Sequence, residues 1–125
     1  MDTPITDTGL PALSFACSWT TDQEVFDLIM SRNPDVNFQA SGGKTPLHLS
    51  AINGNTVAMQ NLMNHPDLDK NCQTFGLETP LMCAIRGGSV DALALLLNNG
   101  ANPFARNGLG QSALDISRTI NSQHQ

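Results

Sequence analysis

Apolar residues recur along the chain at intervals of 33 or 34 positions. The segments that begin at Pro11, Thr45, Thr79 and Ser112 superpose on one another, and their apolar positions align in columns. The first column holds Leu13, Leu47, Leu81 and Leu114, the second holds Phe15, Leu49, Cys83 and Ile116, and a third holds Leu28, Leu62 and Leu96. This periodicity predicts three full structural units and the start of a fourth, with the columns facing a shared core.

The unit that begins at Thr45 shows how each unit is expected to fold. The Thr45 side chain can accept a hydrogen bond from a free backbone N–H at a helix start. Pro46 suits the first helical position, because the N–H that it lacks would have no partner there. The pattern predicts a short helix to about Ile52, which Gly54 ends in a left-handed conformation.

A second helix is predicted over residues 56–64, TVAMQNLMN, whose apolar side chains fall on one face. His65 and Pro66 end this helix. Helices of this length are marginally stable alone in water, so each pair must bury its apolar stripe against the next pair. The units are therefore expected to stack.

The terminal units differ from the central ones. In the first unit, the polar stretch TTDQE at residues 20–24 is assigned to the second helix, which suits a cap that meets solvent on one side. The fourth unit stops after one helix, near Ile120. Either that helix is a sufficient cap or the chain was cut from a longer array, and the sequence favours neither reading.

The motifs of the units resemble those of ankyrin repeats: TPLH at 45–48, TPL at 79–81, DVN at 35–37 and LLLNNGANP at 95–103. The resemblance covers residues 10–120. It implies an all-α fold, a solenoid of stacked helix-turn-helix units with β-hairpin-like loops. It places repeats near 10–43, 44–77 and 78–110 and a partial repeat at 111–120, between a flexible segment 1–9 and a tail 121–125. Leu77 departs from the family pattern, because it stands where a loop glycine is usual.

Charge and hydropathy exclude two classes of partner. The 125 residues carry a formal net charge of −5, and no basic face of the kind that nucleic acids require can be assembled. The longest apolar run, ALALLL at 92–97, is far shorter than the ~20 residues that span a bilayer. We therefore expect no direct contact with nucleic acid and no membrane partner.

The three cysteines, Cys17, Cys72 and Cys83, show no spacing typical of a metal site, and the N-terminal residues show no secretory signal. We expect reduced thiols, no metal, and a cytoplasmic location, with the nucleus as the second choice. A reactive or intermolecular thiol is the alternative for the odd cysteine.

Three motifs suggest chemistry but fit structural roles better. The column of His48 holds no second histidine or cysteine, and the resemblance implies that its ring holds the Thr-Pro turn by hydrogen bonding. HPD at 65–67 matches the signature of J-domain co-chaperones, but the helix before it contains no Lys or Arg. SGGKT at 41–45 lacks the first glycine of a phosphate-binding loop. We expect no catalytic residue, no cofactor and no enzyme activity.

Asn37 and Asn71 occupy corresponding loop positions. The resemblance implies that such an asparagine is a candidate for hydroxylation by an oxygen-dependent dioxygenase. The alternative is a turn residue held by hydrogen bonds.

The resemblance also implies where a partner would bind, along a concave strip formed by the loop tips and the ends of the first helices. The apolar candidates are Trp19, Ile52, Phe75 and Leu109, and the charged candidates around them are Lys44, Glu78, Arg86 and Arg106. Aromatic and arginine side chains inside a polar rim are typical of binding hot spots. The alternative is that Trp19 packs on the cap and Phe75 on a neighbouring loop.

Together these observations predict a non-catalytic protein–protein interaction module that binds a partner protein. The alternative is a regulatory or targeting fragment of a longer ankyrin array attached to an enzyme or a channel. A self-sufficient protein is expected to be a monomer. A cut array would instead expose an apolar end after Ile120 and self-associate through it.

Overall fold

The computed structural model describes residues 12–123, which form seven α-helices and one short 3-10 helix. They are α1 (Ala12–Trp19), α2 (Gln23–Met30), η1 (Ser41–Gly43), α3 (Pro46–Ile52), α4 (Thr56–Met63), α5 (Pro80–Gly87), α6 (Val90–Asn98) and α7 (Ala113–Gln123). No strand occurs among these residues, and the predicted all-α fold is confirmed. The predicted segment 1–9 lies outside the described residues, and α7 runs to Gln123 instead of ending near Ile120.

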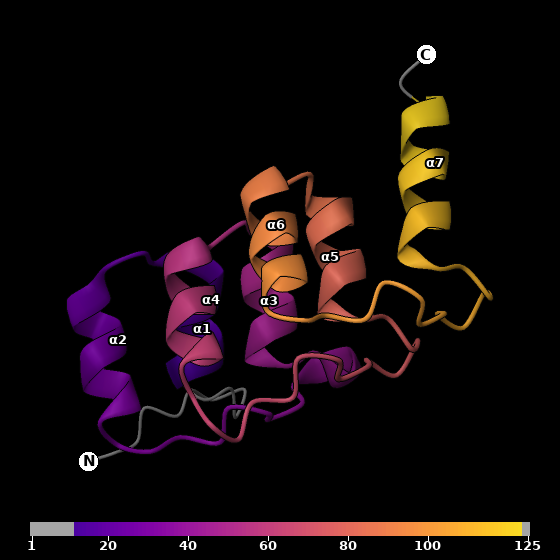
Figure 1. Cartoon of the computed structure of the whole chain (residues 1–125). Coiled ribbons are helices and arrows are strands. Elements are labelled where there is room, and N and C mark those ends of the chain that lie inside the picture. The colour runs from indigo at the N-terminus through magenta and orange to yellow at the C-terminus, as the bar shows by residue number, and fades with distance from the viewer. Residues whose placement is uncertain (1–11, 124–125) are drawn as a thin grey trace.

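The helices form two rows that stack along one direction (Figure 1). The first helices of the units, α1, α3, α5 and α7, make one row, and the second helices, α2, α4 and α6, make the other. α3 packs against both α1 and α5, and α5 packs against α7, so contacts run from each unit to the next. The predicted helical solenoid is confirmed.

A side-chain cap begins the helices of the two central units. The Thr45 hydroxyl accepts a hydrogen bond from the His48 N–H at 3.4 Å, and Pro46 takes the first helical position, as predicted. Equivalent caps begin α4, α5 and α6, at Asn55, Thr79 and Ser89. These caps satisfy backbone N–H groups that a short helix would otherwise leave unpaired.

The core is one apolar cluster that extends through all the units. Leu47 and Leu81 of the first-helix row are buried, and so are Leu62 and Leu96 of the second-helix row. Stability therefore rests on contacts within and between units, as in other repeat stacks.

Leu28 is exposed, so its predicted place in the third apolar column is wrong. The cause is one extra residue in the turn of the first unit. The helix start at Ala12 and the N-cap at Asp22 lie ten positions apart, whereas Pro46 and Asn55 lie nine apart.

The extra residue shifts the register of α2 by one position. Ile29 lies seven positions after its N-cap, as Leu62 does, and it packs against the core in place of Leu28. The prediction that TTDQE lies in the second helix is also wrong in part, because residues 20–22 precede α2 and Asp22 caps it.

Phe15 and Leu114 are exposed as well, although their columns predict burial. Both residues lie in terminal units, which have a neighbouring unit on one side only. The fourth unit has in addition no second helix among the described residues, so nothing there covers Leu114.

Leu77 adopts the left-handed conformation, with φ 65°, at the loop position where the neighbouring loops carry Gly43 and Gly110. A leucine at positive φ is strained by about 1 kcal/mol, which glycine avoids. We therefore expect Leu77→Gly to stabilise the fold by up to ~1 kcal/mol in urea denaturation. Leu77→Ala, which keeps the strain, is the control and should give no such gain.

Candidate protein-binding surface

Three long loops project from one end of the helices and form hairpin-like turns (Figure 1). One backbone hydrogen bond closes each turn: Ala40 N–H to Lys44 O at 2.8 Å, Thr74 N–H to Glu78 O at 2.9 Å, and Asn107 N–H to Gln111 O at 2.9 Å. We call residues 40–44, 74–78 and 107–111 the loop ridge.

Neighbouring turns of the loop ridge are bonded to one another. The Phe75 N–H donates to the Gly42 carbonyl at 3.0 Å, and the Gly108 N–H donates to the Gly76 carbonyl at 2.8 Å. Side-chain amides add two bonds, from Gln39 to the Gln73 carbonyl and from Gln73 to the Arg106 carbonyl. The ridge is therefore a connected surface rather than three independent loops.

Asn37 and Asn71 help to hold the loops together below the ridge. The Asn37 side chain accepts from the Asp69 N–H at 2.9 Å and donates to the Asp67 carbonyl at 2.8 Å. The Asn71 side chain accepts from the Asn102 N–H at 2.8 Å. Both asparagines thus serve as hydrogen-bonded turn residues.

Phe75 and Leu109 lie on the loop ridge and are largely exposed, at 74% and 82%. The backbone of Phe75 is fixed by its bond to Gly42, and its ring lies so close to Gly43 that a Cβ there would meet the ring at 2.6 Å. The alternative predicted for Phe75, packing on a neighbouring loop, describes the base of this side chain. Most of the ring still faces solvent.

Trp19 and Ile52 end the helices α1 and α3, and both are exposed. The Trp19 side chain is 65% exposed and meets the Phe15 ring edge to face, with the ring centroids 5.3 Å apart. Phe15 is therefore a surface residue that the column pattern missed. Its spacing of four positions from Trp19 on one helix is the signal that could have paired them.

Glu78 and Arg86 form an ion pair, with Arg86 donating to both carboxylate oxygens at 2.8 Å and 2.6 Å. The Asn107 amide donates to the same carboxylate at 3.0 Å. Partial burial tends to raise the pKa of Glu78, but the hydrogen bonds from Arg86 and Asn107 lower it overall. The hydrogen bond to Glu78 in turn raises the pKa of Arg86.

The other two predicted cations, Lys44 and Arg106, are exposed on the loop ridge. One Arg106 nitrogen donates to the Gly110 carbonyl at 2.7 Å and lies 3.7 Å from an Asp115 carboxylate oxygen. The structure thus gathers Lys44, Phe75, Glu78, Arg106 and Leu109 on the ridge. Trp19, Ile52 and Arg86 lie on the first helices, and the Glu78–Arg86 pair joins the two groups.

His48 is buried and holds two repeats together. The Thr45 N–H donates to Nδ1 at 3.1 Å, and Nε2 lies 2.9 Å from the Glu78 carbonyl oxygen. An N–H only donates and a carbonyl only accepts, so the ring is neutral and carries its proton on Nε2. These contacts give His48 a structural role in the Thr-Pro turn.

We expect stability to fall as the pH drops below about 6.5, because burial lowers the pKa of His48 in the folded chain. The unfolded chain then binds a proton that the folded chain resists, and acid favours unfolding. Urea denaturation at about pH 7.5 and about pH 5.5 should show the loss. His48→Gln should be less stable at the higher pH and lose this dependence, whereas His65→Gln should keep it. An equal pH dependence in His48→Gln would contradict the assignment.

The buried thiols are unreactive in this environment. Burial raises the pKa of Cys17 to about 12 and that of Cys83 to about 11. Within residues 12–123, no three His, Cys, Asp or Glu side chains gather as metal ligands would. None of the described helices combines the length and the hydropathy that crossing a bilayer requires.

Comparison with known families gives a match over most of the chain. A family model described as ankyrin repeats (3 copies) matches residues 8–107. The human SMC5-SMC6 complex localization factor protein 1 is 34% identical over 110 residues, which is 86% of this chain and 10% of that protein. The mouse ankyrin repeat and SAM domain-containing protein 6 is 31% identical over 112 residues, 89% of this chain and 13% of that protein.

A third relative is the transient receptor potential cation channel subfamily A member 1 homolog of Caenorhabditis elegans. It is 35% identical over 83 residues, 66% of this chain and 7% of that protein. The chain thus spans only about a tenth of the length of these relatives. The matched repeats, the stacked helix pairs and the Thr-Pro caps agree, and the chain belongs to the ankyrin-repeat family.

Proposed function

We propose that this chain is a non-catalytic module that binds a partner protein across the loop ridge and the adjoining ends of α1, α3 and α5. Ankyrin repeats generally serve protein interaction through such extended surfaces. The observation that supports the proposal most is the exposure of Trp19, Phe75 and Leu109 on a framework held by hydrogen bonds between loops. The residues of the predicted strip remain the proposed contacts.

The framework matters because binding costs conformational freedom. Loops that are already bonded to one another lose little freedom when a partner docks, so more of the contact energy appears as affinity. Large side chains presented on such a surface are suited to be anchors, and the polar groups around them give specificity. Lys44 and Arg106 supply exposed positive charge at this rim and would favour acidic groups on the partner.

Affinity capture from the native source tests the proposal. The tagged chain should retain a specific partner protein, and the triple variant Trp19→Ala, Phe75→Ala, Leu109→Ala should lose it. The double variant Val25→Ala, Leu28→Ala changes exposed apolar residues of α2 instead and is the control. If the triple variant and the control retain the same protein equally well, this surface is not the binding site.

A second candidate is that the repeats belong to a longer array and regulate or target a protein attached to them. The short span of the chain on its relatives favours this reading, since one relative is named a complex localization factor and another a cation channel homolog. In either case the repeats would work as a monomer that contacts protein, in the cytoplasm or the nucleus. Sizing of the native gene product in its source separates the two candidates.

A further inference from the structure

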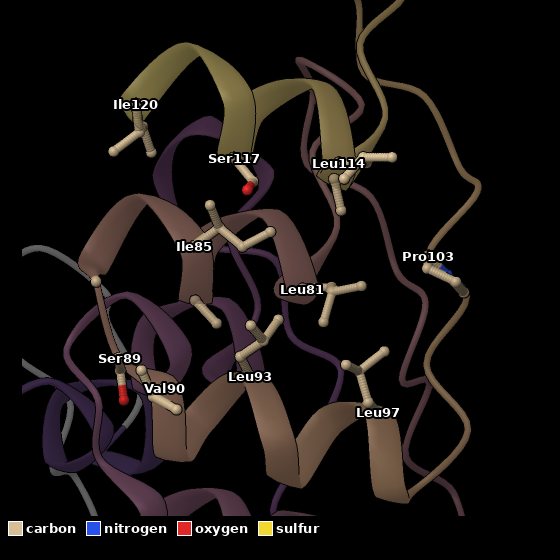
Figure 2. Close-up of a pocket in the computed structure, with 13 residues that line it drawn as sticks. Leu81, Ile85, Ser89, Val90, Leu93, Leu97, Pro103, Leu114, Ser117 and Ile120 are labelled. Atoms are coloured by element: carbon tan, nitrogen blue, oxygen red, sulfur yellow. The ribbon is translucent and has the colours of Figure 1, made fainter. Parts of the chain in front are cut away.

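A groove of about 420 Å³ runs along the last units of the stack, away from the loop ridge. Its floor is α5, with Leu81 and Ile85, and one wall is α6, with Leu93 and Leu97. The other wall is α7, whose residues Leu114, Ser117 and Ile120 face α6 across the groove (Figure 2). Of the side chains that line the groove, only those of Ser89 and Ser117 are polar, and none is charged. This lining does not suit a charged or polar small ligand, which needs several convergent polar groups.

The repeat symmetry of the chain shows what fits such a groove. α4 packs against the first helix of its own unit (α3) and against both helices of the preceding unit (α1 and α2). The groove offers the same three neighbours one step further along: α7 as the first helix of its unit, and α5 and α6 as the preceding pair. A helix in the groove would therefore continue the row formed by α2, α4 and α6.

Leu114 records the missing cover directly. Its side chain is 57% exposed. The residues at the same position of the second and third units, Leu47 and Leu81, are 0% and 1% exposed, and each of these units has a second helix. Leu114 is thus an apolar side chain in a position that a helix covers elsewhere in the same chain.

The covering helices share a sequence pattern that defines the chemistry of the occupant. Counted from its N-cap, α4 carries Ala58 at the third position, Met59 at the fourth and Leu62 at the seventh. α6 carries Ala92, Leu93 and Leu96 at the same positions. The alanine and the final leucine are fully buried in both helices. An occupant of the groove needs a polar N-cap followed by this pattern of one small and two large apolar residues.

A second copy of the chain does not offer such a helix. The pattern occurs in α4 and α6, whose key residues are buried in their own stack. In α2 the corresponding residues are Val25, Phe26 and Ile29, and Phe26 is fully buried. In α7 the corresponding residues counted from Ser112 are Asp115, Ile116 and Thr119, which break the pattern.

We propose that the groove binds a short amphipathic helix of a partner protein, which carries the small-large-large apolar pattern and completes the fourth unit in trans. Recognition of this kind is helix-in-groove binding, with the apolar face of the peptide giving the affinity. The site is separate from the loop ridge, so one chain could hold two different contacts.

The test uses a fluorescein-labelled peptide with the sequence of residues 88–100, which contains α6, and follows its anisotropy as the full chain is added. We expect saturable binding of one peptide per chain. Leu114→Lys and Leu97→Lys should each weaken binding on the order of tenfold or more, because each places a charge in an apolar contact. Both residues are exposed, so these variants should fold. Leu28→Lys, at an exposed leucine on the other end of the stack, is the matched control and should bind as wild type does.

Three outcomes would overturn the proposal. The first is a lack of saturable binding, and the second is binding that Leu114→Lys and Leu97→Lys leave unchanged. The third is a wild-type dimer, seen by light scattering at the titration concentrations, that Leu114→Lys converts to a monomer, since a second copy would then cover the groove. None of these results depends on the loop ridge, so the proposed function would stand or fall separately.

Discussion

Leu62→Ala is expected to lower the free energy of unfolding by about 2–5 kcal/mol, because it leaves a cavity at a fully buried position between the helix rows. Leu62 belongs to the continuous core cluster, and a loss there weakens the contacts of α4 with several neighbouring helices. Urea denaturation followed by circular dichroism measures the change. A stack of this size has only a few kcal/mol of stability to lose, so partial unfolding at 25 °C would be a consistent result.

Phe75→Ala is the counterpart of this experiment on the loop ridge. Its ring is 74% exposed, and we expect a change of less than about 1 kcal/mol. Arg86→Ala should also cost no more than about 1 kcal/mol, because its ion pair with Glu78 is only partly buried. If Phe75→Ala destabilises the fold as much as Leu62→Ala does, the division into core and binding surface is wrong.

Gly87→Ala is expected to destabilise the stack by about 1–3 kcal/mol or more, although alanine normally favours a helix over glycine. A Cβ at Gly87 would lie 2.2 Å from the carbonyl oxygen of Ile52, a backbone atom that cannot move without shifting α3 against α5. Gly87 therefore sets how closely two units approach. Equilibrium denaturation of Gly87→Ala gives the cost.

Gly76→Ala is the matched control for this prediction. Its backbone is not in the left-handed region, and the nearest atom to an added Cβ would be the Thr74 hydroxyl at 3.8 Å. We expect a change within about 0.5 kcal/mol. A Gly87→Ala variant as stable as Gly76→Ala would show that α3 and α5 are not held at this distance.

The stacking of the units follows from the sequence because the same local signals recur in it. Threonine or asparagine caps, proline at the first helical position and apolar columns at a fixed spacing each favour the same element in each central unit. The positions of Leu47, Leu62 and Leu81 in the core could therefore be predicted. Leu77 could be recognised as a departure, and its positive φ confirms that the backbone there keeps the form that glycine allows.

The errors come from the ends of the stack and from one insertion. A fixed period of 34 cannot detect an extra residue within a turn, so Leu28 was placed where Ile29 packs. Phe15 and Leu114 have the residue types of the core but lack a neighbour on one side, and the residue type alone does not reveal this. End effects of this kind require knowing which helices exist beyond the unit.

The candidate surface was predictable by position but not by pairing. The sequence places Glu78 and Arg86 eight residues apart, in a loop and on a helix, and gives no sign that they neutralise each other in a bidentate ion pair. The groove beside α7 was equally hidden, since it is formed by the absence of a helix among the described residues. Tertiary structure decides both features.

Photo-crosslinking tests most directly the central claim, that partner proteins bind across the loop ridge and the ends of the first helices. A photoreactive phenylalanine analogue would replace Phe75 or Trp19 on this surface, or Leu28 on α2 as the comparison, and each exposed position tolerates the change. The account predicts adducts with the captured partner from positions 75 and 19 and none from position 28. Adducts from position 28 alone would place the partner on the opposite row of helices and contradict the account.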